Sequence, residues 1–149
     1  MTVLLDTNVV SEGMKPDCDP AVLSFLESAG HEFFLSTITV FELLNGVKQL
    51  PDGHRRKQLE RSIAAVLESY SFNTLAIDSS VSSAAAEASA ERRSQGRPAD
   101  LADLLIAGTC LANGLTLATR NVKDFTGITG LTVVNPFERS ETRLPTNGH

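Results

Sequence analysis

The stretch VLLDTNVVSE, residues 3–12, places an acid directly behind an apolar run. Residues 3–5 are typical of a short buried strand, and Asp6 follows at the point where that strand ends. Such an aspartate can begin an Asx turn through Asn8. Alternatively it faces a ligand, because ligands bind beyond the carboxyl ends of the strands in open parallel sheets. For a strand-end acid in an α/β sheet we favour the second interpretation.

The rest of the chain alternates short apolar runs with helical patterns. We expect strands at residues 3–5, 33–35, 72–77, 116–118 and 132–134, and helices at residues 20–29, 39–50, 54–70, 80–95 and 101–113. This alternation with short connections predicts a three-layer α/β/α sandwich around a parallel sheet of about five strands. Residues 1–137 then form one domain, and residues 138–149, which lack apolar periodicity, form a flexible tail.

Composition narrows the class of protein. With 149 residues and a net charge of −5, the chain is not a simple basic nucleic-acid binder, and an acidic protein that handles phosphate needs a metal ion or a local basic patch. Cys18 and Cys110 lack CxxC spacing and look like reduced thiols, and a disulfide between them is the alternative that the sequence leaves open. The N-terminus has neither a basic region nor a long apolar run, so we expect no signal peptide, no membrane span and a cytoplasmic location.

Acidic side chains recur where the predicted strands end. Asp6 follows the first strand, Glu42 lies in the first turn of the helix after the second strand, and Asp103 lies in the first turn of the last helix. Asn121 and Asp124 follow the strand at residues 116–118. Because the carboxyl ends of parallel strands meet at one edge of a sheet, these side chains are expected to lie together.

Each acid also has a purely structural interpretation. The run from Thr39 to Glu42 matches a capping box, Asp103 suits the dipole of its helix, and Asp124 can be a cap residue. Asp103, however, begins a helix that is apolar nearly all round, where a carboxylate needs a partner. Several carboxylates converge only around a positive charge, and all-oxygen ligation favours Mg²⁺ or Mn²⁺ over Zn²⁺.

Three segments together resemble a known family. They are LLDTNVVSE, STITVFELLNG and DLLIAGTCLANGLTLATRNVKDF, and the resemblance to the PIN-domain ribonucleases, above all to the VapC-type toxins of toxin–antitoxin pairs, covers residues 3–137. It implies Mg²⁺-dependent hydrolysis of RNA, with Mn²⁺ as a possible substitute, and an antitoxin partner. It also implies a homodimer, or a heterotetramer or larger assembly with the antitoxin.

The resemblance assigns roles residue by residue. Asp6, Glu42 and Asp103 match the family's first three acids, with Asp6 and Asp103 as direct metal ligands. The sequence has Asn121 where many members carry an aspartate, so Asp124 is the nearest fourth acid and the number of metals stays open. The remaining expected members of the site, which orient water or substrate, are Thr7, Thr119, Asn121 and Arg97.

Two basic clusters are either RNA-guiding patches or solvated helix faces. They are Arg55, Arg56, Lys57 and Arg61 in the first, and Arg92, Arg93 and Arg97 in the second. The sequence also leaves two other functions open. A haloacid-dehalogenase-like phosphatase places an aspartate after its first strand as well, but it requires a second one where this chain has Asn8. A non-catalytic binding module would use the acids only as helix caps.

Overall fold

The computed structural model describes residues 1–138, and within them five strands form one parallel sheet. The strands are β1 (Thr2–Leu5), β2 (Glu32–Ser36), β3 (Thr74–Leu75), β4 (Thr116–Ala118) and β5 (Val133–Val134). Their spatial order is β3-β2-β1-β4-β5, and Leu4 is in register with Phe34 on one side and Leu117 on the other. The prediction of a parallel sheet of about five strands is therefore confirmed.

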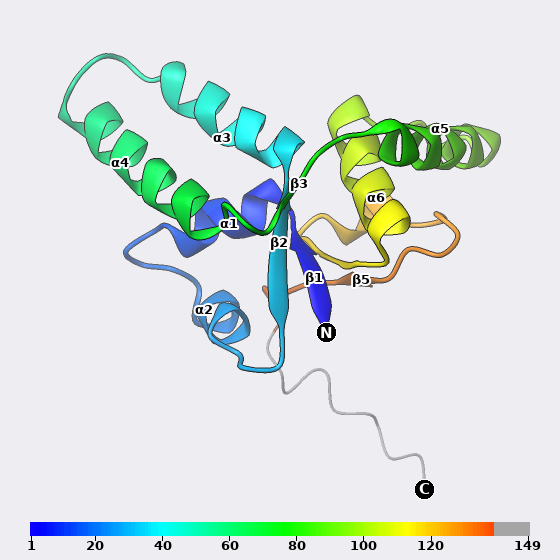
Figure 1. The fold of residues 1–149 in the computed structure, drawn as a ribbon, viewed down its shortest axis with the longest axis horizontal. Helices are drawn as coiled ribbons and strands as arrows, with labels where there is room; N and C mark the ends of the chain where they lie inside the picture. The colour runs from blue at the N-terminus through cyan, green and yellow to red at the C-terminus, as the bar shows by residue number, and fades with distance from the viewer. Residues whose placement is uncertain (139–149) are drawn as a thin grey trace, which may run out of the picture.

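Helices cover both faces of this sheet, as Figure 1 shows. They are α1 (Thr7–Gly13), α2 (Pro20–Leu26), α3 (Thr37–Lys48), α4 (His54–Ser69), α5 (Ser79–Ser94) and α6 (Leu101–Asn113), with a 3₁₀ turn η1 (Val122–Phe125) after β4. The expected tail falls outside the described residues except for Glu138. No helix of the described part is long and apolar enough to cross a membrane.

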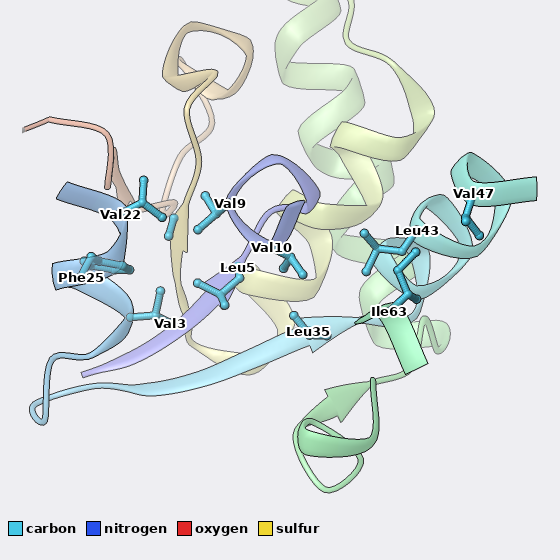
Figure 2. Packing of buried hydrophobic residues seen from close by; sticks show 11 residues of the cluster. Val3, Leu5, Val9, Val10, Val22, Phe25, Leu35, Leu43, Val47 and Ile63 are labelled. Carbon is cyan, nitrogen blue, oxygen red and sulfur yellow. The ribbon is translucent and has the colours of Figure 1, made fainter. Parts of the chain in front are cut away.

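The sheet lies between two hydrophobic cores, and the side chains of β1 point alternately into one and the other. Val3 and Leu5 point to the side of α1 to α4, where Figure 2 shows them among Val22, Phe25 and the other labelled residues. Leu4 belongs to the other core, with residues of α5 and α6. Because all three side chains are essentially inaccessible to solvent, β1 is buried on both faces, as the central strand of an α/β sheet must be.

The helices of the second face, α5 and α6, are in close contact. A Cβ atom added at Gly108 would lie 2.6 Å from the carbonyl oxygen of Val81 and 2.9 Å from Ala85 Cβ. Any larger residue at position 108 would therefore push the helices apart. This contact fixes α5 against α6, the helix that carries Asp103.

The main error of the sequence prediction concerns helix starts. We expected no helix at residues 7–13, yet α1 begins directly after Asp6, whose side chain accepts a hydrogen bond from Thr7 N at 2.8 Å. The capping box at Thr39 and Glu42 was also wrong, since α3 begins two residues earlier and Ser36 Oγ accepts from Ile38 N at 3.2 Å. Glu42 thus lies in the second turn of α3, without a role in its cap.

Candidate active site

Asp6 is a buried carboxylate that hydrogen-bond donors surround. Besides Thr7 N, its oxygens accept from Thr119 Oγ1 at 2.7 Å and from Asn8 Nδ2 at 3.1 Å. The donors come from α1 and from the end of β4, which are adjacent because β1 and β4 are neighbours in the sheet. Burial nevertheless dominates and raises the pKa of Asp6, while these bonds act in the opposite direction.

Glu42 is held by a hydroxyl of α1. Thr7 Oγ1 donates to Glu42 Oε1 at 2.7 Å and lies 3.1 Å from the hydroxyl of the fully buried Thr39. A hydroxyl has one proton, so Thr7 gives its proton to the carboxylate and accepts from Thr39 in turn. This chain of hydroxyls sets the position of Glu42 relative to Asp6. Glu42 adds to the negative field that raises the pKa of Asp6.

Asp103 and Asp124 form the other half of the site. Burial raises the pKa of the half-buried Asp103 to about 6, and the next largest causes are the negative charges of Asp6, Asp124, Asp100 and Glu42, in that order. Within residues 1–138 no hydrogen bond or ion pair is made to the carboxylates of Asp103 and Asp124. The negative charges of the other three predicted acids therefore all act on Asp103.

The other predicted site residues occupy different positions. Thr119 is fully buried and also accepts from Asn121 N at 3.1 Å. Asn121 is exposed, and its carbonyl accepts from Asp124 N at 3.0 Å, which starts η1. Arg97 is exposed and lies 3.4 Å from Thr126 Oγ1, with no hydrogen bond to the four acids among the described residues.

The basic clusters separate into accessible and inaccessible members. Arg92 is only 6% exposed, so it is not available for RNA, contrary to the expectation for its cluster. Arg56 pairs with Asp52 and Glu60, at 3.0 and 2.9 Å. Arg55 lines a cleft of about 470 Å³ between α1, α3 and α4. The same cleft is lined by Thr7 and Glu42, so it extends from Glu42 to Arg55 of the first basic cluster.

The acidic site fits a hard divalent cation in its donor chemistry. Carboxylate oxygens are the ligands that Mg²⁺ and Mn²⁺ prefer. None of the ion pairs in the described part of the chain involves the four acids, so no protein cation there offsets their mutual repulsion. No three acidic, histidine or cysteine side chains there form a preassembled metal cage. The match is thus one of charge and donor type, with Asp6 and Asp103 as the expected ligands.

Sequence reasoning missed two contributors to this site. In the sequence, Asn8 points only to an Asx turn and argues against a phosphatase, whereas its amide donates to Asp6 and its Oδ1 accepts from Arg120 N at 3.2 Å. Thr39 was assigned to a helix cap, whereas its hydroxyl supports Thr7. The two-residue spacing between Thr37 and Thr39 gave no signal that the second would face the acids, because the start of α3 was misplaced.

Curated relatives resemble this chain over nearly all of its length. The plasmid stability protein StbB of Pseudomonas syringae pv. tomato is 38% identical over 138 residues, covering 91% of this chain and 99% of that protein. The VapC ribonuclease Y4jK of Sinorhizobium fredii is 36% identical, with 91% and 98% coverage. Toxin FitB of Neisseria gonorrhoeae is 34% identical, again with 91% and 98% coverage.

Solved structures share the fold. FitAcB from Neisseria gonorrhoeae superposes with a TM-score of 0.83 at 31% identity, over 91% of this chain and 99% of that one. A toxin–antitoxin complex from Klebsiella pneumoniae gives a TM-score of 0.68 at 27% identity, over 91% and 98%. The model of the PIN domain matches residues 3–129. The resemblance seen in the sequence is thereby confirmed, and this chain belongs to the PIN-domain family.

Proposed function

We propose that this protein is a divalent-metal-dependent endoribonuclease that hydrolyses RNA phosphodiester bonds and serves as the toxin of a toxin–antitoxin pair. One observation carries the proposal. Asp6, which follows β1, Glu42 of α3 and Asp124 of η1 are close enough to Asp103 of α6 that their negative charges add to the effect of burial, which raises the pKa of Asp103 to about 6. Similarity to a VapC ribonuclease supports the choice of RNA as substrate, and PIN-domain VapC nucleases are generally dependent on divalent metals.

The residues divide the chemical work. Asp6 and Asp103 would hold Mg²⁺, or Mn²⁺ in its place, which would supply polarisation of the scissile phosphate and a lower pKa for a bound water. Glu42, fixed by Thr7, orients the attacking water or accepts its proton. Thr119 favours the ionised form of Asp6 by donating to it. Asp124 supplies the fourth carboxylate, and Asn121 and Arg97 face the substrate as neutral and cationic orienting groups.

The biological role that we propose includes a protein partner. Similarity to a protein named a toxin and to a toxin–antitoxin complex supports an antitoxin, with the toxin as a homodimer or in a heterotetramer or larger assembly in the cytoplasm. The cleft that joins Glu42 to Arg55 suits an inhibitory segment of that partner. An arginine of the segment would then neutralise Asp6 or Glu42 through charge-assisted hydrogen bonds.

The test is cleavage of total bacterial RNA by the purified chain, with Mg²⁺, with Mn²⁺ and with EDTA, followed by mapping of the new ends. We expect cleavage with either metal and none with EDTA. Hydrolysis of p-nitrophenyl phosphate without RNA cleavage would favour the phosphatase, and neither activity would favour the binding module. Asp17→Asn, which changes an exposed acid outside the site, is the matched control for the active-site variants and keeps full activity.

A further inference from the structure

Side chains at the end of α5 make hydrogen bonds to the loop that follows η1. Arg92 Nη1 donates to the carbonyl oxygen of Thr126 at 2.7 Å, and Gln95 Nε2 donates to the carbonyl oxygen of Gly127 at 2.9 Å. Glu91 accepts from the backbone nitrogen of Thr129 and, at 2.8 Å, from its hydroxyl. We refer to Glu91, Arg92 and Gln95 as the α5 clamp. Its three side chains fix residues 126–129, which directly follow η1.

Arg92 is an unusual residue for this location. It is 6% exposed, its Nε makes no hydrogen bond, and none of the ion pairs within residues 1–138 includes it. A buried charge without a counter-charge is costly. The hydrogen bonds that the Arg92 side chain does make are to Thr126, through Nη1 to the carbonyl and, at 3.4 Å, to the hydroxyl. We therefore assign the buried guanidinium of Arg92 the role of binding this loop.

The gripped loop leads directly to an active-site acid. Thr126 Oγ1 donates to the carbonyl of Lys123 at 3.0 Å, and Asp124 N donates to that of Asn121 at 3.0 Å, so Thr126 and Asp124 belong to one hydrogen-bonded turn. This turn contacts α6, where Asp103 lies. The same α5 is fixed against α6 at Gly108. Helix α5 thus holds both elements that carry Asp103 and Asp124: it contacts α6 directly and holds η1 through the clamp.

We propose that Arg92 is a positioning residue, which holds η1 through Thr126 so that Asp124 stays beside Asp103. This inference rests on the proposed function, because it assigns Asp124 to the cleavage of RNA. It also gives the buried member of the second basic cluster a role other than contact with RNA. Loosening the clamp moves Asp124 without touching Asp6 or Glu42, which other elements hold.

The experiment compares Arg92→Met with Arg93→Met, which removes the same charge from an exposed neighbour on the same helix. Amide hydrogen exchange is measured in the metal-free full chain. We expect Arg92→Met to speed exchange at residues 123–127 about tenfold or more while residues 104–110 stay protected, because the loop opens locally. Arg93→Met leaves both segments unchanged. Unchanged exchange at residues 123–127 in Arg92→Met would refute the clamp.

Cleavage of an RNA oligonucleotide that contains a mapped cut site supplies the second readout. A displaced catalytic group lowers the rate by about 10- to 100-fold, so we expect kcat of Arg92→Met to fall by this factor while KM stays within about threefold. Arg92→Lys, which can still donate to Thr126 O, recovers part of the rate. Combining Arg92→Met with Asp124→Ala adds little to the loss from Asp124→Ala alone, because both changes remove the same carboxylate from the site.

The outcomes separate the two hypotheses. If the wild-type chain does not cleave RNA with Mg²⁺ or Mn²⁺, the proposed function is wrong, and the exchange data still decide whether the clamp exists. Losses that multiply in the double variant, or full activity of Asp124→Ala, would show that Arg92 does not act through Asp124 and would overturn the inference. Should Arg92→Met fail to fold, Gln95→Ala removes an exposed clamp residue and is expected to show the same effects more weakly.

Discussion

The two halves of the acidic site are built differently. Asp6 and Glu42 accept hydrogen bonds from Thr7, Asn8 and Thr119, so the protein itself fixes their carboxylates. Asp103 and Asp124 accept none within the described residues, and their carboxylates are positioned through the helices that carry them. The first pair is preorganised by protein donors, whereas the second pair exposes negative charge that the fold leaves unbalanced.

This difference indicates that one half of the site keeps its carboxylates in place while the other half provides most of the attraction for a cation. Hydrogen bonds to a carboxylate hold it in place and favour its charged form. A carboxylate without them keeps its full attraction for a cation, and its repulsion from other acids persists until the cation arrives. The half built by β1 and α3 therefore acts as a rigid reference, and the half built by α6 and η1 supplies the uncompensated charge. Variants that alter only one of the halves test this division.

The largest effect is expected from Asp6→Asn and Asp103→Asn. Both variants lose cleavage by at least about 100-fold, because losing a charged group that acts on the transition state has this order of effect. Their stabilities differ, however. Without metal, Asp103→Asn relieves repulsion and raises the thermal midpoint by roughly 2–4 °C. In Asp6→Asn, the new NH₂ group cannot accept the hydrogen bonds that donors give to Asp6, so a donor is left without an acceptor. The thermal midpoint of Asp6→Asn therefore lies below that of Asp103→Asn.

Activity and thermal midpoint are measured on the same preparations, with EDTA present during the melts. Asp17→Asn is the control for loss of a carboxylate elsewhere. Full activity in either variant would remove that residue from the site. Equal midpoints for the two variants would mean that the hydrogen bonds around Asp6 do not distinguish the two halves.

A smaller loss is expected from Thr7→Val, which keeps the shape of the side chain but removes its hydroxyl. Glu42 then loses its donor and Thr39 loses its acceptor, so the first half of the site loosens. Removing a supporting partner of this kind typically lowers activity by about 10- to 100-fold, and we expect kcat to fall while KM changes little. Thr7→Ser restores the hydroxyl and most of the rate. If Thr7→Val is as active as wild type, Glu42 does not depend on this hydrogen bond.

The sequence predicted the acids and the sheet but not how the acids are held. Apolar runs at residues 3–5 and 116–118 were correctly predicted as strands of one parallel sheet, and their pairing brings Asp6 close to Thr119. The starts of the helices were harder to predict, because Asp6 both follows a strand and caps α1, in addition to the role that we propose for it in the active site. The sequence could not decide whether Ser36 or Thr39 caps α3, because a helix could plausibly begin after either residue.

The misassigned Arg92 shows a second limit of sequence reasoning. In the run ERRSQGR, Arg92 and Arg93 are indistinguishable by composition and differ by one position in helical phase. That phase decides that Arg92 is buried against the loop after β4 while Arg93 is exposed. The apolar residues of α5 are Val81 and five alanines, which give a weak periodic signal, so the buried face of the helix could not be predicted from the sequence.

A dependence of stability on pH follows from the raised pKa of Asp103. Its carboxyl binds a proton more tightly in the fold, with a pKa of about 6 against an ordinary value of 3.8. The stabilising contribution of protonation is complete below about pH 3.8 and is lost as the pH rises through about 6. In EDTA, the midpoint of the wild-type chain therefore gains from Asp103 as the pH falls from about 7.5 to about 5.5.

The difference between Asp103→Asn and the wild type isolates this contribution from all other groups. We expect the variant to be more stable than wild type at about pH 7.5, with the advantage shrinking toward about pH 5.5, as measured by thermal melts at both pH values. The pKa of Asp6 is raised in the same direction and Asp6 is present in both proteins, so its contribution largely cancels in the comparison. An advantage of Asp103→Asn that is independent of pH would contradict the assignment of the raised pKa to Asp103.

The smallest effect is expected from Asn121→Asp, which adds a carboxylate to the half of the site that already carries unbalanced charge. Asn121 is exposed and begins η1, one turn from Asp124, so solvent screens the new charge. An exposed charge close to a cation is worth on the order of 1 kcal/mol or less, which corresponds to a gain of up to about fivefold in affinity. Titration of Mn²⁺ by calorimetry into wild type, Asn121→Asp and Asn121→Ser measures it, with serine as the neutral control. An unchanged affinity in Asn121→Asp would show that position 121 does not face the acids, and the fourth carboxylate of the site would then be Asp124 alone.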